Sequence, residues 1–539
     1  MKTFFKYILF SSVVSLTACE KFDEINSNPE ETDRVSSAML ATKIILDFAN
    51  QPNLALASQP NLGLITELNF DLANKPNFDL ANQPIHKSFM LPYLLNKNVV
   101  WTEFAEAYQY NGFGERSLDF RVINDAYFMS KFAESDKLAK SYEGLMYFAR
   151  AIKFFEATMD LGDIPYSDAL KGEDSKIYFP KYDNQKDVFI GILNELELAD
   201  QSFSEGETFT GDPMYNGDVT KWRKLVNSFA LNVLIQLSKK EAEGDLQVKQ
   251  KFQSILSNKP IFTSNADNFQ LIRSNNTGQL YPFYKVGNNF VNYPIISTEI
   301  VDRLKDGNDR RLFYYANPSP VKIAEGMTQT DFDAYIGVDP SQIYDNISRI
   351  KNTNDYSKLN NRYTELANGE PTQKLSYSQL CFIIAEASAR GWVSESTVNW
   401  YTKGVEASMK FIYDNTPNEA AFHHNMPLDN TYISNYIAAL DAGFPVGLDD
   451  QIEKIITQKY LASFLQSSVY TYYDYRRTGY PKWKINPSTS LNSDDPTKIP
   501  VRWKYPSAEF DYNTVNVDAA VARQFDGVDV VNKVMWLLK

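Results

Sequence analysis

Residues 136–161, DKLAKSYEGLMYFARAIKFFEATMDL, decide the fold class of this chain. Their apolar residues recur at steps of three and four, which places them on one face of a helix. That face carries Leu138, Tyr142, Leu145, Met146, Ala149, Ile152 and Phe155. The stretch therefore predicts a long amphipathic α-helix, and the glycine that follows it, Gly162, is suited to end it in a left-handed turn.

The same helical pattern recurs in several later segments of the chain. These segments are 184–202, 221–239, 376–390, 396–415 and 450–467. The third and fourth of them predict a helical hairpin around Gly391. Long stretches rich in aromatic residues, Asn, Gly and Pro separate the helices, chiefly 258–300, 313–375 and 478–530. We therefore expect an all-α body of paired helices with its function on the loops and only a few short strands.

The first residues of the chain have the pattern of a secretion signal. A basic start at Met1–Lys6 is followed by the apolar run Tyr7–Leu16, which is too short to span a bilayer. Residues 1–18 are therefore predicted to be a signal peptide. The run closes with Leu16-Thr17-Ala18-Cys19, which looks like a bacterial lipobox, in which the Cys19 thiol is acylated and becomes the mature amino terminus. The alternative is an ordinary secreted protein with an incidental cysteine after its signal.

The residues behind Cys19 predict how the body is attached. Residues 19–35 are polar and acidic, with a turn signal at Asn26–Pro29, which indicates a flexible tether. Residues 36–539 then form the globular domain. Within it, residues 49–84 repeat an Asn-Xaa-Pro pattern at irregular spacing, which favours a looped insertion over a solenoid.

Composition excludes several classes of partner. The chain has 54 basic and 67 acidic residues, a formal charge of −13, which argues against nucleic acid and against anionic lipid surfaces as ligands. We expect contact with a membrane through the lipid anchor only. The one cysteine besides Cys19 is Cys381, in the apolar run Leu-Cys-Phe-Ile-Ile, where a buried inert thiol is expected.

No catalytic or metal-binding motif stands out. The three histidines are His86, His423 and His424, and none has acidic partners at the spacing of a metal site. No cofactor motif is present. A glycosidase pair could be imagined among so many carboxylates, but the sequence does not bring any two to the ~5 to 9 Å that hydrolysis requires. We therefore expect a protein without catalytic residues, metal or cofactor.

Five segments, in order behind the lipobox, resemble the SusD/RagB family of nutrient-binding outer-membrane lipoproteins. They are Asp160–Ala169 (DLGDIPYSDA), Met214–Asp218 (MYNGD) followed by Lys221–Phe229 (KWRKLVNSF), Ala385–Gly391 (AEASARG), Gln458–Tyr460 with Asp474–Pro481 (DYRRTGYP), and Ile499–Pro506 (IPVRWKYP) with Glu509 and Asn513–Asn516. The chain departs from this pattern in the apolar run Leu231–Leu237, where many relatives carry arginines, and in the Asn-Xaa-Pro insertion. We interpret these motifs as structural and not as ligand-binding. Arg476 and Arg477, for example, are expected to pair with Asp474 or another carboxylate.

The resemblance implies a fold and a function. The fold is a SusD-like domain with tetratricopeptide-like helices. The function is capture of an oligosaccharide or another nutrient, such as a peptide, at the outer face of the outer membrane and its transfer to a SusC-like TonB-dependent barrel. One alternative is a structural subunit that gates this barrel and has little affinity for a ligand. Another, less favoured, is a glycoside hydrolase.

The resemblance also indicates where the ligand would bind. In relatives the ligand face draws on the region before the first long helix and on the loop-rich middle of the chain. We therefore predict ligand contacts from Trp101 and from a segment in which aromatic and amide residues interleave without a helical period: Tyr281, Phe283, Tyr284, Asn289 and Tyr293. The alternative for each aromatic residue is packing in the core.

Overall fold

The computed structural model describes residues 35–49, 97–101, 112–276, 278–286, 291, 293–466 and 468–539. The predicted signal peptide 1–18, Cys19, nearly all of the tether 19–35 and nearly all of the repeat 49–84 lie outside the described residues. Among the described helices, none combines the length and the apolar character that crossing a bilayer requires.

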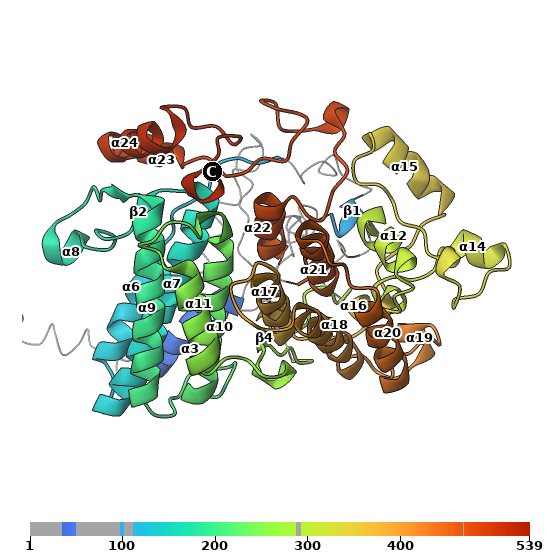
Figure 1. Cartoon of the computed structure of the whole chain (residues 1–539), viewed down its shortest axis with the longest axis horizontal. Helices are drawn as coiled ribbons and strands as arrows, with labels where there is room; N and C mark the ends of the chain where they lie inside the picture. The colour runs from blue at the N-terminus through green and yellow to red at the C-terminus, as the bar shows by residue number, and fades with distance from the viewer. Residues whose placement is uncertain are drawn as a thin grey trace, which may run out of the picture.

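Helices dominate the structure, and the first group of them packs in sequence order (Figure 1). Neighbours pack against each other from α3 through α6, α7 and α9 to α10 and α11. Their bounds are α3 Ser37–Ala49, α6 Arg121–Lys131, α7 Asp136–Leu161, α9 Gln185–Glu205, α10 Val219–Gln236 and α11 Val248–Asn258.

A second group of helices lies beside the first. Its members are α17 Tyr377–Ala389, α18 Thr397–Asp414, α20 Asn430–Ala442, α21 Leu448–Ala462 and α22 Ser468–Thr478. Within it α17 packs on both α18 and α21, and α10 of the first group contacts α17 and α22. Figure 1 shows the two groups side by side, so the helices form a continuous body. The predicted all-α fold of paired helices is confirmed.

Short elements connect and cover these groups. The further helices are α8 Gly172–Ser175, α12 Thr298–Asp306, α13 Leu312–Tyr315, α14 Pro320–Ala324, α15 Tyr344–Thr353, α16 Asn361–Thr364, α19 Ala420–His423, α23 Ser507–Tyr512 and α24 Thr514–Phe525. The strands form antiparallel pairs: β1 Val99–Trp101 with β5 Pro294–Ile296, β2 Ile164–Pro165 with β3 Tyr182–Asp183, and β4 Phe269–Leu271 with β6 Thr372–Leu375. The stretches 258–300, 313–375 and 478–530 were predicted as loops, and they contain several of these short helices.

Helix α7 has the bounds that its apolar pattern predicts. The side chain of Ser135 caps it by accepting a hydrogen bond from the backbone N–H of Leu138 at 3.1 Å. Gly162 ends it at a φ of +100°, a conformation that other residues rarely adopt. The apolar face then packs on α10, where the Phe155 ring lies 5.3 Å from that of Phe229.

Helix α17 is fixed at both ends by its sequence. Ser376 and Gln379 form a capping box at its start, and Gly391, at a φ of +70°, follows its end as predicted. Cys381 lies on this helix and is fully buried. Its predicted burial is confirmed, and burial raises the pKa of its thiol to about 12.

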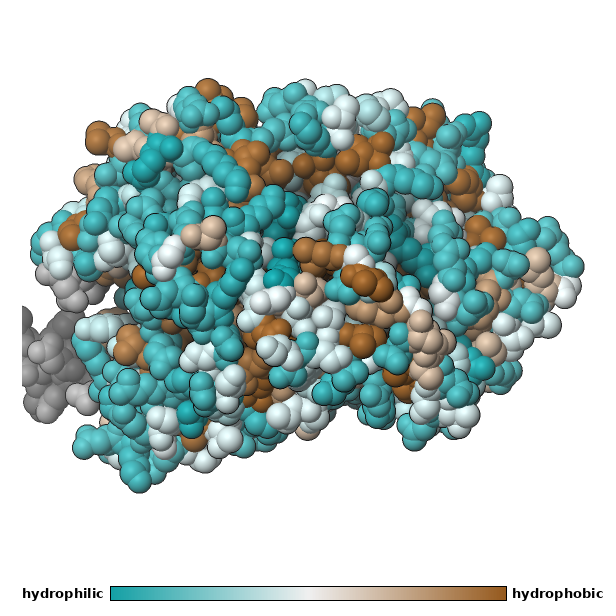
Figure 2. Space-filling model, viewed as in Figure 1, coloured by the Kyte–Doolittle hydropathy of each residue, from teal (hydrophilic) through white to brown (hydrophobic). Residues whose placement is uncertain are grey.

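Nearly all the buried apolar residues belong to one hydrophobic core. It runs from α3 through both helix groups to the last residues of the chain. The face shown in Figure 2 is mostly hydrophilic, with scattered hydrophobic patches. The long aromatic-rich connections are therefore held by a rigid helical body.

Candidate functional site

The two segments predicted to bind ligand meet in the β1–β5 strand pair. Trp101, at the end of β1, is paired with Pro294, at the start of β5, so the backbone before the first long helix adjoins the aromatic segment of the middle region. The backbone N–H of Ser297 donates to Asn98 at 3.1 Å, and that of Ile296 donates to Ser357 at 3.0 Å. β5 is therefore held from more than one side. The position of the Trp101 side chain lies outside what the structure describes.

Two of the predicted ligand residues are buried in the core. Tyr281 is 4% exposed and Phe283 is 2% exposed, and both belong to the main hydrophobic cluster. The N–H of Tyr281 donates to the carbonyl of Ala367 at 2.7 Å, and its ring lies over Gly369, where a Cβ would clash with it. These two residues take the core role that the sequence analysis gives as the alternative to ligand contact.

Tyr284 and Tyr293 are less buried than Tyr281 and Phe283. Both residues are half-buried, and both pack against the core. Asn289 lies outside the described residues. Of the predicted aromatic side chains that the structure describes, Tyr284 and Tyr293 are thus the ones that stay partly exposed.

A neighbouring segment, residues 361–370, supports the aromatic segment. The backbone N–H of Lys285 donates to Thr364 at 3.0 Å, and its ammonium pairs with Glu365 at 2.5 Å. An exposed pair of this kind contributes little energy, about 0 to 1 kcal/mol. Arg362 and Glu370 of the same segment form a buried pair at 2.6 Å, and loss of either partner would leave an uncompensated buried charge.

A buried lysine, Lys97, lies just before β1. Burial lowers the pKa of Lys97 to about 8, although the charges of Glu299 and Asp339 oppose this shift. Its ammonium donates to the carbonyl of Lys484 and lies 5.8 Å from the ring centroid of Trp483. No motif predicted this lysine, because its burial depends on segments far away in the sequence.

The structure adds an exposed aromatic group that the sequence analysis did not single out. We call it the α23 aromatic patch; its rings are Tyr178 at 65% exposure, Phe179 at 62% and Tyr512 at 77%. The side-chain amide of Asn513 donates to the carbonyl of Pro180 at 2.9 Å, and that of Asn516 donates to Phe179 at 3.2 Å. Both amides thus hold the 178–180 segment against α23 and α24, which lie above β2 at the top left of Figure 1. The sequence signal was only a Tyr-Phe-Pro run in a loop.

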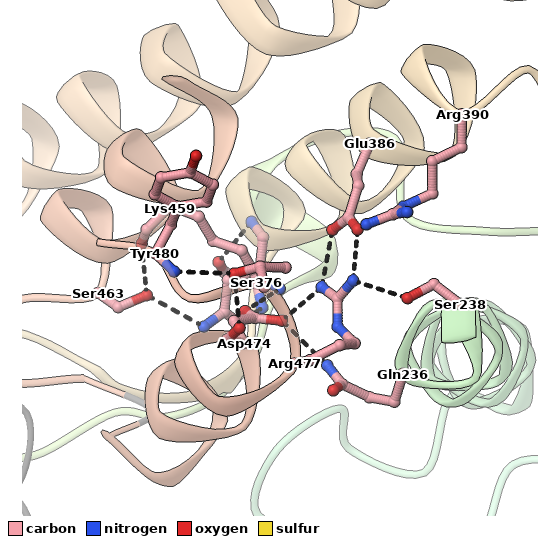
Figure 3. Close-up of polar contacts among 12 residues, drawn as sticks. Gln236, Ser238, Ser376, Glu386, Arg390, Lys459, Ser463, Asp474, Arg477 and Tyr480 are labelled. Atoms are coloured by element: carbon pink, nitrogen blue, oxygen red, sulfur yellow. Dashed lines mark hydrogen bonds and ion pairs between the residues drawn. The ribbon is translucent and has the colours of Figure 1, made fainter. Parts of the chain in front are cut away.

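A buried ionic cluster joins three helices (Figure 3). Arg477 of α22 donates to both carboxylate oxygens of Glu386 in α17 and, at 3.0 Å, to Asp474. Asp474 also pairs with Lys459 of α21 at 2.8 Å. Burial alone would raise the pKa of Glu386, but the charges of Arg477 and Arg390 hold it below its usual value. The predicted pairing with Asp474 or another carboxylate is confirmed for Arg477, whereas Arg476 donates to the carbonyl of Val501 at 3.0 Å.

The histidines offer no metal site in the described part of the chain. His424 lies 3.2 Å from the amide nitrogen of Asn360, and His423 lies 3.1 Å from Asn418. Burial lowers the pKa of His424 to about 4, which keeps its ring neutral at neutral pH. Among the described residues, no group of three or more His, Cys, Asp or Glu side chains is placed to hold a metal ion.

Comparison with known proteins supplies the family. A family model described as starch-binding, associating with the outer membrane, matches residues 53–506. None of the curated protein sequences compared with the chain is significantly similar to it.

Solved structures are similar over nearly the whole chain. A SusD homologue from Bacteroides fragilis NCTC 9343 is 39% identical, with a TM-score of 0.84, and the match covers 94% of this chain and 100% of that one. Another SusD homologue from the same strain is 31% identical, with a TM-score of 0.76 and the same coverage. A chitin-binding SusD homologue from Flavobacterium johnsoniae shares the fold at 18% identity and a TM-score of 0.65, over 86% of this chain and 97% of that one. The chain therefore belongs to the SusD-like family.

Proposed function

We propose that this protein captures a carbohydrate at the outer surface of the outer membrane, at the surface around the β1–β5 pair. The observation that carries the proposal is the pairing of Trp101 with Pro294, which joins the two segments expected to bind ligand. Tyr284 and Tyr293 provide partly exposed rings on which the apolar C–H face of a sugar can stack. Trp101 and Asn289 are further proposed contacts.

Carbohydrate is favoured over peptide by the comparisons. The matching family model is described as starch-binding, and one structural relative is described as chitin-binding. The ordered strand pair and its buried supports favour a preformed site, which lowers the entropic cost of binding an oligosaccharide. Affinity is expected to be moderate, because the ligand must be released again.

The binding site is tested by isothermal calorimetry with a panel of starch and chitin oligosaccharides. The double variant Tyr284→Ala/Tyr293→Ala should bind at least about tenfold more weakly than the wild-type protein, because each lost stack is worth about 1 kcal/mol or more. The matched control is Tyr178→Ala/Tyr512→Ala in the α23 aromatic patch, which should bind normally. If only the control variant lost binding, the ligand would bind at the α23 aromatic patch and not at the β1–β5 pair.

Anchoring and delivery form the second part of the proposal. Cys19 carries the lipid, residues 19–35 act as the tether, and a SusC-like TonB-dependent barrel receives the ligand. Cys19→Ala should release the protein from the membrane fraction without detergent, and the wild-type protein should co-purify with the barrel. If binding is absent across the panel while uptake through the barrel still requires the protein, the gating role is supported instead. Turnover of any oligosaccharide by the purified protein would support the hydrolase alternative.

A further inference from the structure

A cleft of about 330 Å³ adjoins the buried ionic cluster, which contributes Arg477 to its lining. Four parts of the chain form its walls: the 3₁₀ turn after α10, the end of α17, the start of α21 and the end of α22. The residues that line it are Ser238, Lys239, Arg390, Leu448, Asp449, Ile452, Arg477 and Thr478. The cleft thus joins a polar wall to an apolar one.

Positive charge predominates on the polar wall. Among the lining residues, Lys239, Arg390 and Arg477 outnumber one carboxylate, that of Asp449, which accepts a hydrogen bond from the Tyr480 hydroxyl at 2.8 Å. Behind the lining, Glu386 pairs with both arginines, and the Lys239 ammonium donates to the carbonyl of Leu538 at 3.1 Å. Burial lowers the pKa of Lys239, and the nearby charge of Arg477 lowers it further. Lys239 and Arg477 therefore repel each other, and a bound anion would relieve this repulsion.

Arg477 also has an unused donor. Its side chain is 1% exposed, and the two terminal nitrogens of its guanidinium donate hydrogen bonds to Glu386, Asp474 and Ser238. The Nε–H has no hydrogen-bond acceptor among the described residues. A buried donor in this state is unfavourable, and a ligand oxygen that accepted from it would satisfy it.

We propose that this cleft binds an oxyanion, that is, a carboxylate, sulfate or phosphate group. Its oxygens would accept from Arg477, Arg390 and Lys239, as planar and cationic donors do in known oxyanion sites. An apolar part of the same ligand would lie against Leu448, which is 51% exposed, and Ile452. The proposal does not depend on the carbohydrate site.

The test uses calorimetry of the full-length protein with sodium phosphate, sodium sulfate and sodium hexanoate as probes, each at the same ionic strength as a sodium chloride reference. The double variant Lys239→Gln/Arg390→Gln should bind the preferred probe at least about tenfold more weakly, since each lost charge-assisted hydrogen bond is worth about a factor of ten or more. The control Lys140→Gln/Lys410→Gln removes two exposed cations elsewhere and should bind normally.

The probes also distinguish the sources of the anion. A preference for hexanoate indicates a carboxylate with an apolar tail, and a preference for phosphate or sulfate indicates an inorganic or sugar-borne anion. Selenate soaked into crystals should give an anomalous peak beside Arg477, which locates the anion directly. Equal binding by the wild-type protein and the Lys239→Gln/Arg390→Gln variant, no measurable binding of any probe, or an empty cleft after soaking would overturn the proposal.

Discussion

His424 is a buried histidine in a left-handed backbone conformation, with a φ of +49°. The amide N–H of Asn360, 3.2 Å from the ring Nε2, can donate to it only while that nitrogen is unprotonated. Burial lowers the pKa of His424 to about 4, the nearby charge of His423 lowers it further, and a hydrogen bond to the backbone of Ala316 opposes the shift. The neutral ring is therefore part of the folded structure.

This histidine predicts how stability depends on pH. Because the pKa of His424 is lower in the folded protein than in the unfolded chain, the unfolded chain binds the proton first as pH falls. The contribution to stability is complete above about pH 6.5 and is lost as pH falls to about 4, by up to about 3 kcal/mol. Urea denaturation at several pH values should show this loss in the wild-type protein.

His424→Asn is the matched variant, because asparagine tolerates the left-handed conformation. It should be less stable at pH 7 but lose less free energy of unfolding between pH 6.5 and 4 than the wild-type protein does. Parallel curves for the two proteins would show that other groups, chiefly carboxylates, govern the acid transition.

At the scale of the elements, the ionic cluster of Figure 3 connects α17, α21 and α22. Glu386→Gln removes the charge that faces Arg477 and Arg390, while Asp474 stays in place. Breaking a buried pair leaves an uncompensated charge and costs about 3 to 5 kcal/mol. The free energy of unfolding, measured with urea, should fall by that amount.

The control for this prediction lies on α18. Glu406 pairs with Lys410 at the surface, so Glu406→Gln should cost less than about 1 kcal/mol. A similar small cost for both variants would mean that the buried cluster adds little to stability and serves mainly to position the helices.

The bounds of the helices show how much of the secondary structure the sequence could predict. Helix α7 was predicted at its bounds, and α17 and α18 within a residue at each end, because their apolar faces are continuous and their caps are clear. Helix α20 was missed, since of its side chains only Ile433 and Tyr436 are buried. Helix α24 was missed because it lies in an Asn-rich stretch whose helical pattern is short.

The candidate site was only partly predictable. Interleaved aromatic and amide residues located the segment, but no periodicity distinguishes the buried rings of Tyr281 and Phe283 from the half-buried Tyr284 and Tyr293. That difference depends on Gly369 and Ala367, which lie far away in the sequence. The strand pair that joins β1 to β5 is likewise a long-range contact.

At the scale of the whole molecule, the two helix groups share one core. The main hydrophobic cluster includes Phe148 of α7 in the first group and Ile384 of α17 in the second. Helix α10 contacts both groups through α9 on one side and α17 and α22 on the other. Stability should therefore be distributed over the whole body and not divided between two independent parts.

This continuity predicts a single cooperative unfolding transition for residues 36–539. Phe148→Ala and Ile384→Ala each leave a cavity in the shared core and should cost about 2 to 5 kcal/mol. Since both groups unfold together, each variant should lower the same transition in differential scanning calorimetry by a few degrees, and the calorimetric and van't Hoff enthalpies should agree. Two transitions, with Phe148→Ala moving one and Ile384→Ala the other, would mean that the contacts of α10 are too weak to couple the groups.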